Sequence, residues 1–181
     1  MPDQSTQFLN PRGILEQVGI QAGMRIGDLG CGTGYMSFAA SPMVGAKGRI
    51  YAVDVQKDVI AQVKKEALME NIGNVETVWS NLEIIGATKV PPESLDLALF
   101  VNVLFQINDK KPVFGEARRL LKPGGALLVV DWKQGDTSIG PPAERRLDLA
   151  DVSKIAAETG FVEIGAINAG QYHFGKLFKK A

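Results

Sequence analysis

The chain has 181 residues, of which 45% are hydrophobic and 22% are charged, a composition typical of one globular domain with a substantial core. Twenty basic residues balance twenty acidic residues, so no overall basic field favours nucleic acid or an anionic membrane. The single cysteine, Cys31, excludes an internal disulfide and a multi-cysteine metal site, and we expect no metal. No apolar segment approaches the ~20 residues that span a bilayer, and residues 1–8 lack signal-peptide features, so we expect a cytoplasmic protein.

A short helix is predicted near the N-terminus, with Asn10 as its N-cap and Pro11 at its first position. Gly19 is expected to end it. One interpretation is a small helix that packs on one edge of a sheet. In the other, three residues near its start help to close a ligand site: Gln7, Phe8 and Arg12.

A glycine-rich stretch follows an apolar run that begins at Met24. Its sequence, Asp28-Leu29-Gly30-Cys31-Gly32-Thr33-Gly34, predicts the end of a strand, a tight turn and a helix start. Alternate glycines let the backbone bend sharply and approach a ligand, and we expect free N–H groups at the helix start to meet it. A dinucleotide fingerprint would need its third glycine at position 35, which is Tyr35. The spacing therefore argues against NAD.

An acidic residue follows the second predicted strand. A helix from about Thr33 to Ser41, stopped by Pro42, leads to a strand over 49–53 and then to Asp54. At about twenty residues beyond the glycine turn, an open α/β sheet places a carboxylate that grips ribose hydroxyls. The alternative is a helix cap, a role for which Asp58 is better placed.

A helix over 58–70 leads to a strand over 75–79, and a loop over 84–94 leads to a further strand over 95–101. The second of these strands is apolar on both sides, which suits a central parallel strand covered by helices on both faces. Asn102 follows it, at the edge where open α/β sheets bind ligands.

The C-terminal third continues the strand–helix alternation. Asp109 is expected to cap a helix, and a Lys-Pro-Gly-Gly turn at 122–125 leads into a strand over 126–131. Residues 134–146 are interpreted either as a lid over an acceptor pocket or as a plain surface connection. A helix over 148–159 and strands over 161–167 and 172–178 close the chain. The sequence thus predicts one α/β domain over residues 1–181, a doubly wound, mostly parallel sheet with helices on both faces and an antiparallel C-terminal strand pair.

The motif Asp28-x-Gly30-x-Gly32-x-Gly34 and the helix–Lys-Pro-Gly-Gly–strand passage resemble the class I, Rossmann-like methyltransferases that depend on S-adenosylmethionine (SAM). Within that family, residues 10–178 look most like compact enzymes related to ubiquinone/menaquinone biosynthesis methyltransferases. The resemblance implies SAM as cofactor and S-adenosylhomocysteine (SAH) as product. It implies a binding set of Asp28, Gly30, Cys31, Gly32, Gly34, Asp54, Val55, Asn81, Leu82 and Asn102.

Asn81 departs from the family pattern. The family commonly has an acidic residue here, whose side chain bonds the adenine amino group. The amide oxygen of Asn81 could accept the same hydrogen bond without a charge, or the residue could simply be a polar turn residue.

Methyl transfer from a sulfonium is an in-line displacement, in which an enzyme mainly aligns the nucleophile and excludes water. A strong base is not required; if one is used, the candidates are His173 and Asp131. The leading hypothesis is a small-molecule methyl acceptor. The alternatives are a protein or RNA methyltransferase and a non-catalytic SAM-binding or scaffold protein. We expect no nucleic-acid partner and no membrane insertion, and a monomer or homodimer.

Overall fold

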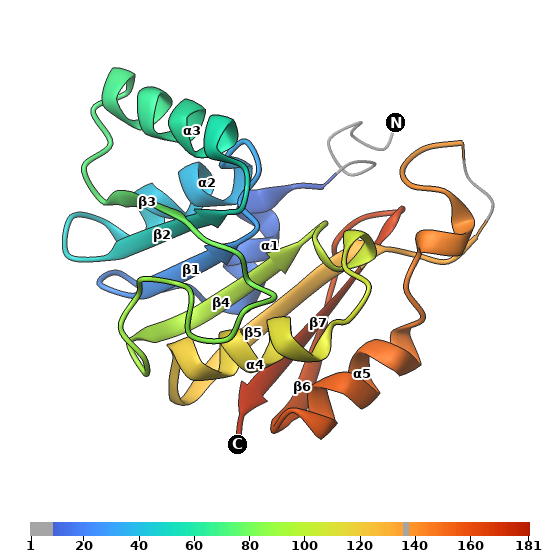
Figure 1. Ribbon diagram of the computed structural model, residues 1–181. Helices are drawn as coiled ribbons and strands as arrows, with labels where there is room; N and C mark the ends of the chain where they lie inside the picture. Colours follow the sequence, from blue (N-terminus) through green and yellow to red (C-terminus); the bar gives the residue numbers. More distant parts are fainter. Residues whose placement is uncertain (1–8, 136–137) are drawn as a thin grey trace.

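The computed structural model describes residues 9–135 and 138–181 (Figure 1). Within them, one sheet has the strand order β3-β2-β1-β4-β5-β7-β6. The first five of these strands are parallel to one another, whereas β7 is antiparallel to both β5 and β6. The strands are β1 (Arg25–Leu29), β2 (Arg49–Asp54), β3 (Val75–Trp79), β4 (Leu95–Val101), β5 (Leu121–Trp132), β6 (Phe161–Ile167) and β7 (His173–Lys180). The predicted sheet with its antiparallel C-terminal pair is confirmed.

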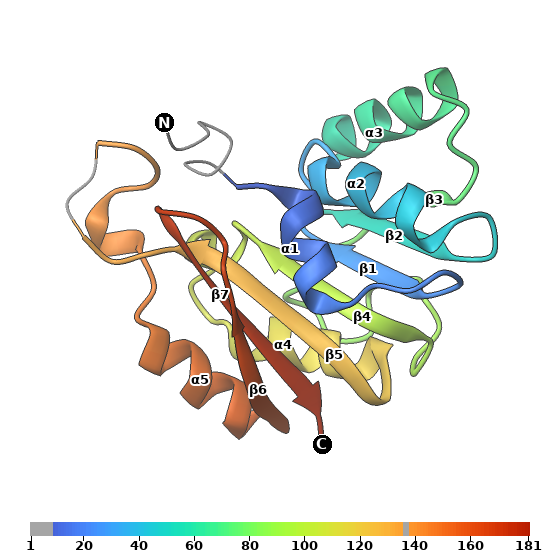
Figure 2. The same ribbon diagram turned by 180° about the vertical axis from the view of Figure 1, so that it is seen from behind.

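Helices cover both faces of the sheet (Figures 1 and 2). On one face lie α1 (Pro11–Val18), α2 (Tyr35–Val44) and α3 (Lys57–Met69), and on the other lie α4 (Lys111–Leu120) and α5 (Leu149–Glu158). The core divides accordingly. Ile50 packs in a cluster with residues of α1 and α2, and Ala52, two residues further along β2, packs against Val63 of α3. Side chains two apart on a strand share a face, so all three helices cover the same side.

The opposite face carries the larger cluster, in which Phe100 of β4 packs 5.6 Å from the ring of Phe114 on α4. The ring of Phe161, at the start of β6, lies 6.2 Å from Phe114 in an edge-on arrangement. These rings belong to one continuous core with the inner faces of α4 and α5. The antiparallel end of the sheet is thereby anchored to its parallel part.

The helix after the glycine turn differs from its expected bounds at both ends. It begins at Tyr35, because Gly34 is in the left-handed region and serves as the N-cap residue. It also runs through Pro42 to Val44. A proline inside a helix removes one N–H donor. The last turn persists because Val44 is fully buried and Gly45 N–H still bonds to the carbonyl of Ser41.

The Lys-Pro-Gly-Gly segment lies within a strand and is not a separate turn. β5 already begins at Leu121, directly after α4, and pairs there with Leu95. The next pair is Leu97 with Ala126, so residues 122–125 form an irregularity in the register. Gly124 takes a φ of 73° in this segment, a conformation that glycine adopts without strain.

Two of the expected helix caps are shifted. The N-cap of α3 is Gln56, and Asp58 lies in the first turn of the helix, where its charge favours the dipole. The N-cap of α4 is Lys110, although the carboxylate of Asp109 accepts a hydrogen bond from the N–H of Lys111 at 3.2 Å. For α1 the expectation is confirmed, since the side chain of Asn10 accepts from Gly13 N–H. Asp58 thus lies two residues after the N-cap of α3, and Asp109 lies one residue before the N-cap of α4.

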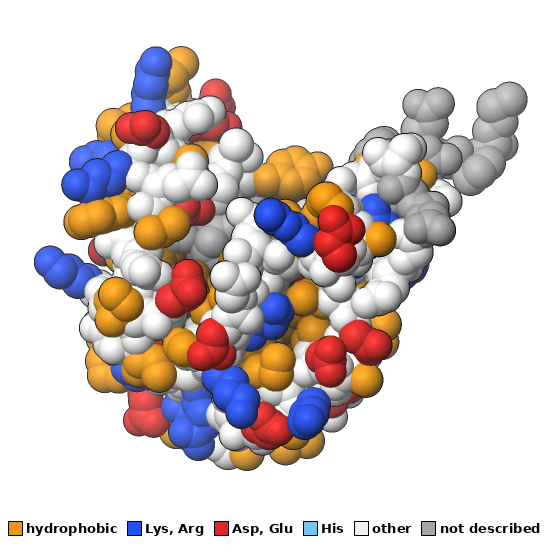
Figure 3. Space-filling view, turned by 45° about the vertical axis from the view of Figure 1, so that its right-hand side comes forward, with side chains coloured by type: hydrophobic (Ala, Val, Ile, Leu, Met, Phe, Trp, Pro, Cys, Tyr) orange, Lys and Arg blue, Asp and Glu red, His pale blue; other side chains and the backbone are white. Residues whose placement is uncertain are grey.

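The segment before α1 contributes to the site through a residue that the sequence did not single out. Leu9 lines the main cavity, whereas the exposed Arg12 forms an ion pair with Glu16 on the same helix. Gln7 and Phe8 lie outside the described residues. Figure 3 shows acidic and basic side chains interspersed over one face of the molecule. Among the residues that the structure describes, no helix is long and apolar enough to cross a membrane.

Candidate functional site

The glycine-rich turn follows β1 and has the backbone conformation that its sequence predicts. Gly30, Gly32 and Gly34 have φ values of 86°, 51° and 81°. Side chains are disfavoured in this region. A Cβ atom at Gly30 would lie 2.5 Å from Cγ2 of Val103, whereas one at Gly32 would meet no atom within 4 Å. The turn therefore packs tightly against Val103 at Gly30 and leaves free space beside Gly32.

Three N–H groups of this turn, which precede the helix start where free donors are expected, are already paired. The N–H groups of Gly30 and Cys31 both donate to the carbonyl of Val53, at 2.7 and 2.9 Å. Gly32 N–H donates to Oδ2 of Asp54 at 3.0 Å. The parallel pairing of β1 with β2 places the end of β2 beside the turn, and its acceptors saturate these donors. A ligand here meets carboxylates and glycine Cα atoms.

Asp28 is buried beneath the turn. It is 2% exposed, and the hydroxyl of Ser37 on α2 donates to its Oδ2 at 2.6 Å. Burial raises the pKa of Asp28 to about 6, against the lowering effect of the bonds from Ser37. Burial likewise raises the pKa of the Cys31 thiol, so that side chain stays protonated at neutral pH. Asp28 thus ties the end of β1 to α2.

The carboxylate of Asp54 stands between the turn and the start of α3. Besides Gly32 N–H at Oδ2, its Oδ1 accepts from Gln56 N–H at 3.0 Å. A carboxylate has about four acceptor positions, so these two bonds fix its orientation and leave capacity for hydroxyl donors. The side chain lines the main cavity, as a ribose-binding role requires.

The main cavity has a volume of about 680 Å³ and lies at the carboxyl ends of the parallel strands. Nine of the ten expected cofactor residues line it. The tenth, Gly34, does not; its Cα faces Phe38 and Val63 inside the helix layer. The wall also includes residues that the sequence did not point to: Leu9, Tyr35, Ser80, Val103, Gln106 and Ile107. These come mostly from loops, which explains why no periodic pattern marks them.

Two amides in this cavity differ in what they offer a ligand. The Oδ1 of Asn102 is buried and has no hydrogen-bond partner among the described residues, and its backbone φ of 57° is left-handed. Asn81 Oδ1 instead accepts from Glu83 N–H at 2.9 Å, as expected of a polar turn residue. An unpaired buried acceptor costs free energy, and a donor on a ligand removes that cost. Asn102 is therefore the stronger ligand-binding position.

The two candidate bases lie in different surroundings. Asp131 is fully buried and accepts from the N–H groups of Leu104 (3.0 Å), Phe105 (3.4 Å) and Trp132 (2.8 Å). It is not among the residues that line the main cavity, whereas His173 is. Burial raises the pKa of Asp131 to about 6. The geometry therefore gives Asp131 the role of holding the chain around 104–105, and leaves His173 at the cavity wall.

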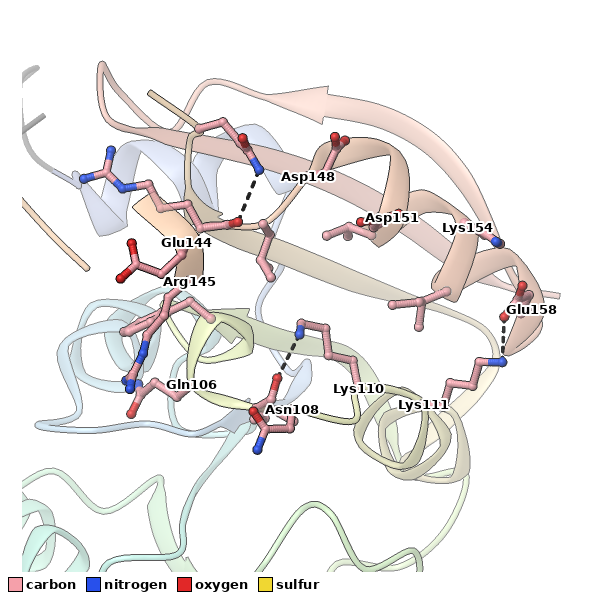
Figure 4. Close-up of a pocket in the computed structure, with 17 residues that line it drawn as sticks. Gln106, Asn108, Lys110, Lys111, Glu144, Arg145, Asp148, Asp151, Lys154 and Glu158 are labelled. Carbon is pink, nitrogen blue, oxygen red and sulfur yellow. Dashed lines mark hydrogen bonds and ion pairs between the residues drawn. The ribbon is translucent and has the colours of Figure 1, made fainter. Parts of the chain in front are cut away.

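A second cavity of about 750 Å³ adjoins the first (Figure 4). Gln106 and Ile107 line both. Lys110 donates to the carbonyl of Ile107 at 2.8 Å, and Lys111 forms an ion pair with Glu158 at 2.8 Å. Side chains of both signs surround it: Lys110, Lys111, Arg145, Arg146, Lys154, Glu144, Asp148, Asp151 and Glu158. Gln134 and residues 144–146, from the stretch interpreted as a lid or a connection, line this second cavity and not the first.

Arg146 organises that stretch. Its side chain is 6% exposed and donates to a set of backbone carbonyls, those of Lys133 (3.5 Å), Gly135 (2.7 Å), Ile139 (2.8 Å) and Pro141 (3.0 Å). Gly140 lies flat against Trp132, since a Cβ there would be 2.6 Å from the indole ring. Trp132 lines the main cavity, so the stretch supports the cavity from behind. Residues 136–137 lie outside the described residues.

Comparisons with known proteins agree with this geometry. Residues 20–180 match a family described as "Methyltransferase domain". The chain is 32% identical over 125 residues to the ubiquinone/menaquinone biosynthesis C-methyltransferase UbiE of Shewanella piezotolerans, and 29% identical over 130 residues to that of Marinomonas. These alignments cover 68% and 71% of this chain but 48% and 50% of the relatives. The chain thus spans about half the length of the curated relatives it matches.

Solved structures show the same fold. A SAM-dependent methyltransferase from Aquifex aeolicus superposes with a TM-score of 0.90 at 27% identity, covering 99% of this chain and 94% of that one. Phosphoethanolamine N-methyltransferase 2 from Haemonchus contortus, solved in complex with SAM, superposes with a TM-score of 0.73 at 22% identity. That alignment covers 86% of this chain and 37% of the other.

Proposed function

The chain belongs to the methyltransferase-domain family and is a SAM-dependent methyltransferase, and from this premise we propose that it methylates a small molecule in the main cavity. The observation that carries the proposal is the shape of the site. Residues from the glycine turn to His173 line a concave site of about 680 Å³, within the range of small-molecule sites. The second cavity beside it gives room for the rest of an acceptor.

The residues present fit the cofactor. The open side of Gly32 leaves space beside the turn, and the oriented carboxylate of Asp54 suits a ribose diol. The unpaired Oδ1 of Asn102 accepts a hydrogen bond from an ammonium group, such as that of the methionine part. Asn81 and Leu82 line the wall beyond Asp54, where the adenine would lie. SAM supplies a methyl group on a positively charged sulfur, which is a good leaving group.

The chain's own residues then have three tasks: to hold the cofactor, to align the acceptor and to exclude water. The first falls to the turn and to Asp54. For the others, Trp132 and His173 line the cavity at the carboxyl end of β5, with their rings 4.2 Å apart. Trp132 is half-buried and His173 is buried, and the two rings offer a surface that excludes water once an acceptor covers it.

We expect SAM and SAH to raise the melting temperature and NAD to leave it unchanged. A ligand that binds only the native state at 100 times its dissociation constant stabilises it by about 2.7 kcal/mol. For a domain of this size that corresponds to a shift of roughly 5–10 °C. Differential scanning fluorimetry measures it. A shift with NAD and none with either SAM or SAH would contradict the proposed cofactor site.

Replacement of Asp54 by alanine is expected to weaken SAM binding by about 1–3 kcal/mol, or roughly 5- to 150-fold, through loss of a charged acceptor. Asp58→Ala is the matched control, because Asp58 carries the same charge in the first turn of α3 but does not line the cavity. Isothermal titration calorimetry gives both affinities. Equal affinity of the two folded variants would remove Asp54 from the site.

Acceptor identity is tested with SAM that carries an isotope-labelled methyl group. The purified protein is incubated separately with metabolite, protein and RNA fractions of a cell extract, and mass spectrometry locates the label. The proposal expects label in the metabolite fraction alone. Label in the protein or RNA fraction would make the chain a macromolecular methyltransferase. Bound cofactor without label in any fraction would indicate a non-catalytic protein.

A further inference from the structure

His173 is a buried polar side chain whose ring nitrogens have no partner among the residues that the structure describes. It is 4% exposed and begins β7, directly opposite Trp132 of β5. A neutral imidazole has one donor and one acceptor, and each buried group left unpaired costs about 1–3 kcal/mol. Buried polar groups are nearly always satisfied, so this arrangement needs an explanation.

The position of the ring indicates which group could pair with its nitrogens. His173 lines the main cavity together with Trp132, at the carboxyl end of β5. The two rings are tilted by 42° with their centroids 4.2 Å apart. Their contact holds the ring against the cavity wall, where both nitrogens are buried. A turn about the Cβ–Cγ bond, a broad torsion, when the acceptor binds would bring a nitrogen to the cavity. A bound acceptor is therefore a natural hydrogen-bond partner.

The ring is also kept in its neutral form. Burial, with a smaller effect from the charge of Lys133, lowers the pKa of His173 to about 4. Three carboxylates line the cavity: Asp28 and Asp54 lie beside the glycine turn, and Glu83 lies on the loop after β3. At neutral pH the imidazole thus holds a free lone pair, and the same burial makes it a weak base, which limits the protons that it can accept to strongly acidic ones.

We propose that His173 is a catalytic residue that accepts the proton of a hydroxyl group on the methyl acceptor. This inference rests on the proposed function and names its acceptor class, a hydroxyl compound. The attacking atom is the hydroxyl oxygen, or a carbon conjugated to it. That atom forms a bond to the methyl carbon, the carbon–sulfur bond breaks, and its electron pair stays on sulfur to give SAH. The hydroxyl proton moves to a ring nitrogen of His173 and passes to water when the product leaves.

Hydroxyl chemistry fits a weakly basic imidazole better than amine chemistry does. An oxygen that gains a methyl group becomes strongly acidic, so even a buried imidazole takes its proton. An amine must attack without its extra proton, and its methylated product holds the remaining one far more tightly than this imidazole would. Methylation of an amine would therefore transfer no proton to His173.

The test starts with the product identified by labelled SAM. We expect the label on a hydroxyl oxygen or on a carbon conjugated to one. With that acceptor, His173→Gln is expected to lower the transfer rate at least ~100-fold, the usual contribution of a general base. Its residual rate should rise with pH, as the acceptor loses its proton unaided, whereas the wild-type rate stays flat above about pH 6. Gln171→Ala, an exposed neighbour outside the cavity wall, is the control.

A second measurement uses the unaltered protein. Because His173 is the only histidine of the chain, labelling histidine with ¹⁵N gives the signals of this one ring. Addition of the acceptor to the SAH complex is expected to shift a ring-nitrogen signal as a hydrogen bond forms. SAH alone is expected to leave the signal unchanged. This readout does not depend on whether the variant folds.

The outcomes separate this inference from the proposed function. SAH binding with label on a hydroxyl compound, a silent histidine spectrum and an unimpaired His173→Gln rate would overturn the role of His173 while keeping the function. Label on an amine or thiol would overturn the acceptor class. Failure to bind SAM, or cofactor binding without any labelled small molecule, would overturn the proposed function and this inference with it.

Discussion

Replacement of Asp131 by alanine is expected to lower the free energy of unfolding by about 3 kcal/mol or more. The carboxylate is fully buried and accepts three backbone N–H groups, from Leu104, Phe105 and Trp132. Each donor left unpaired in the interior costs about 1–3 kcal/mol, and partial relaxation makes the sum smaller than the total. Equilibrium unfolding in urea at pH 7 measures the loss. We therefore expect Asp131 to act on stability.

The loss should also depend on pH. Burial raises the pKa of Asp131 from 3.8 to about 6, so the folded protein binds this proton more tightly than the unfolded chain does. Such a group contributes stability that is present below about pH 4 and is lost as the pH rises through 6. The difference between wild type and Asp131→Ala should therefore be larger at about pH 4.5 than at pH 7.5. Asp28 titrates in the same direction but is common to both proteins and cancels.

Asp109→Ala is the matched control. That carboxylate accepts a single exposed hydrogen bond, from Lys111 N–H, so its loss should cost under ~1 kcal/mol. Equal losses for the two variants would show that Asp131 does not hold the chain at 104–105. A drop in methyl transfer from Asp131→Ala with stability unchanged would return Asp131 to the list of candidate bases.

The fold was predictable because its signals are local. Alternate glycines demand left-handed backbone, and the structure gives all three a positive φ. Apolar runs that end in Asp54 and Asn102 place both residues at the carboxyl edge of a parallel sheet. The prediction that Pro42 stops the helix is wrong for a local reason. The burial of Val44 stabilises the last turn more than the missing N–H donor of Pro42 destabilises it.

The pairing of the turn was not predictable from the sequence. Whether Gly32 N–H is free depends on which atom of β2 lies beside it, and that follows from the register between strands. The same holds for the candidate bases. Asp131 and His173 both lie near the carboxyl end of β5, yet only the structure distinguishes a carboxylate that bonds three amides from an imidazole at a cavity wall. Sequence patterns give the edge of the sheet, and packing decides which side chains face the ligand.

Replacement of Arg146 by methionine is expected to lower methyl transfer more than tenfold while SAH affinity stays within a few-fold of wild type. Arg146 holds the stretch before α5 by donating to four backbone carbonyls, and bonds from a charged donor are worth about 1.5–3 kcal/mol each. Without them, Gly140 loses its place against Trp132, and the aromatic wall of the acceptor side loses its support.

Cofactor binding should survive because the turn, Asp54 and Asn102 lie on other elements than the carbonyls to which Arg146 donates. Transfer is measured with labelled SAM and the metabolite fraction, SAH affinity by calorimetry, and exposure of the stretch by limited proteolysis. Arg49→Met is the control, since Arg49 is an exposed arginine at the start of β2, whereas Asp54 lies at the end of that strand. Parallel losses of SAH affinity and transfer would make the stretch part of the cofactor site. Unchanged transfer with faster proteolysis would reduce it to a surface connection, because the acceptor side would then keep its shape without it.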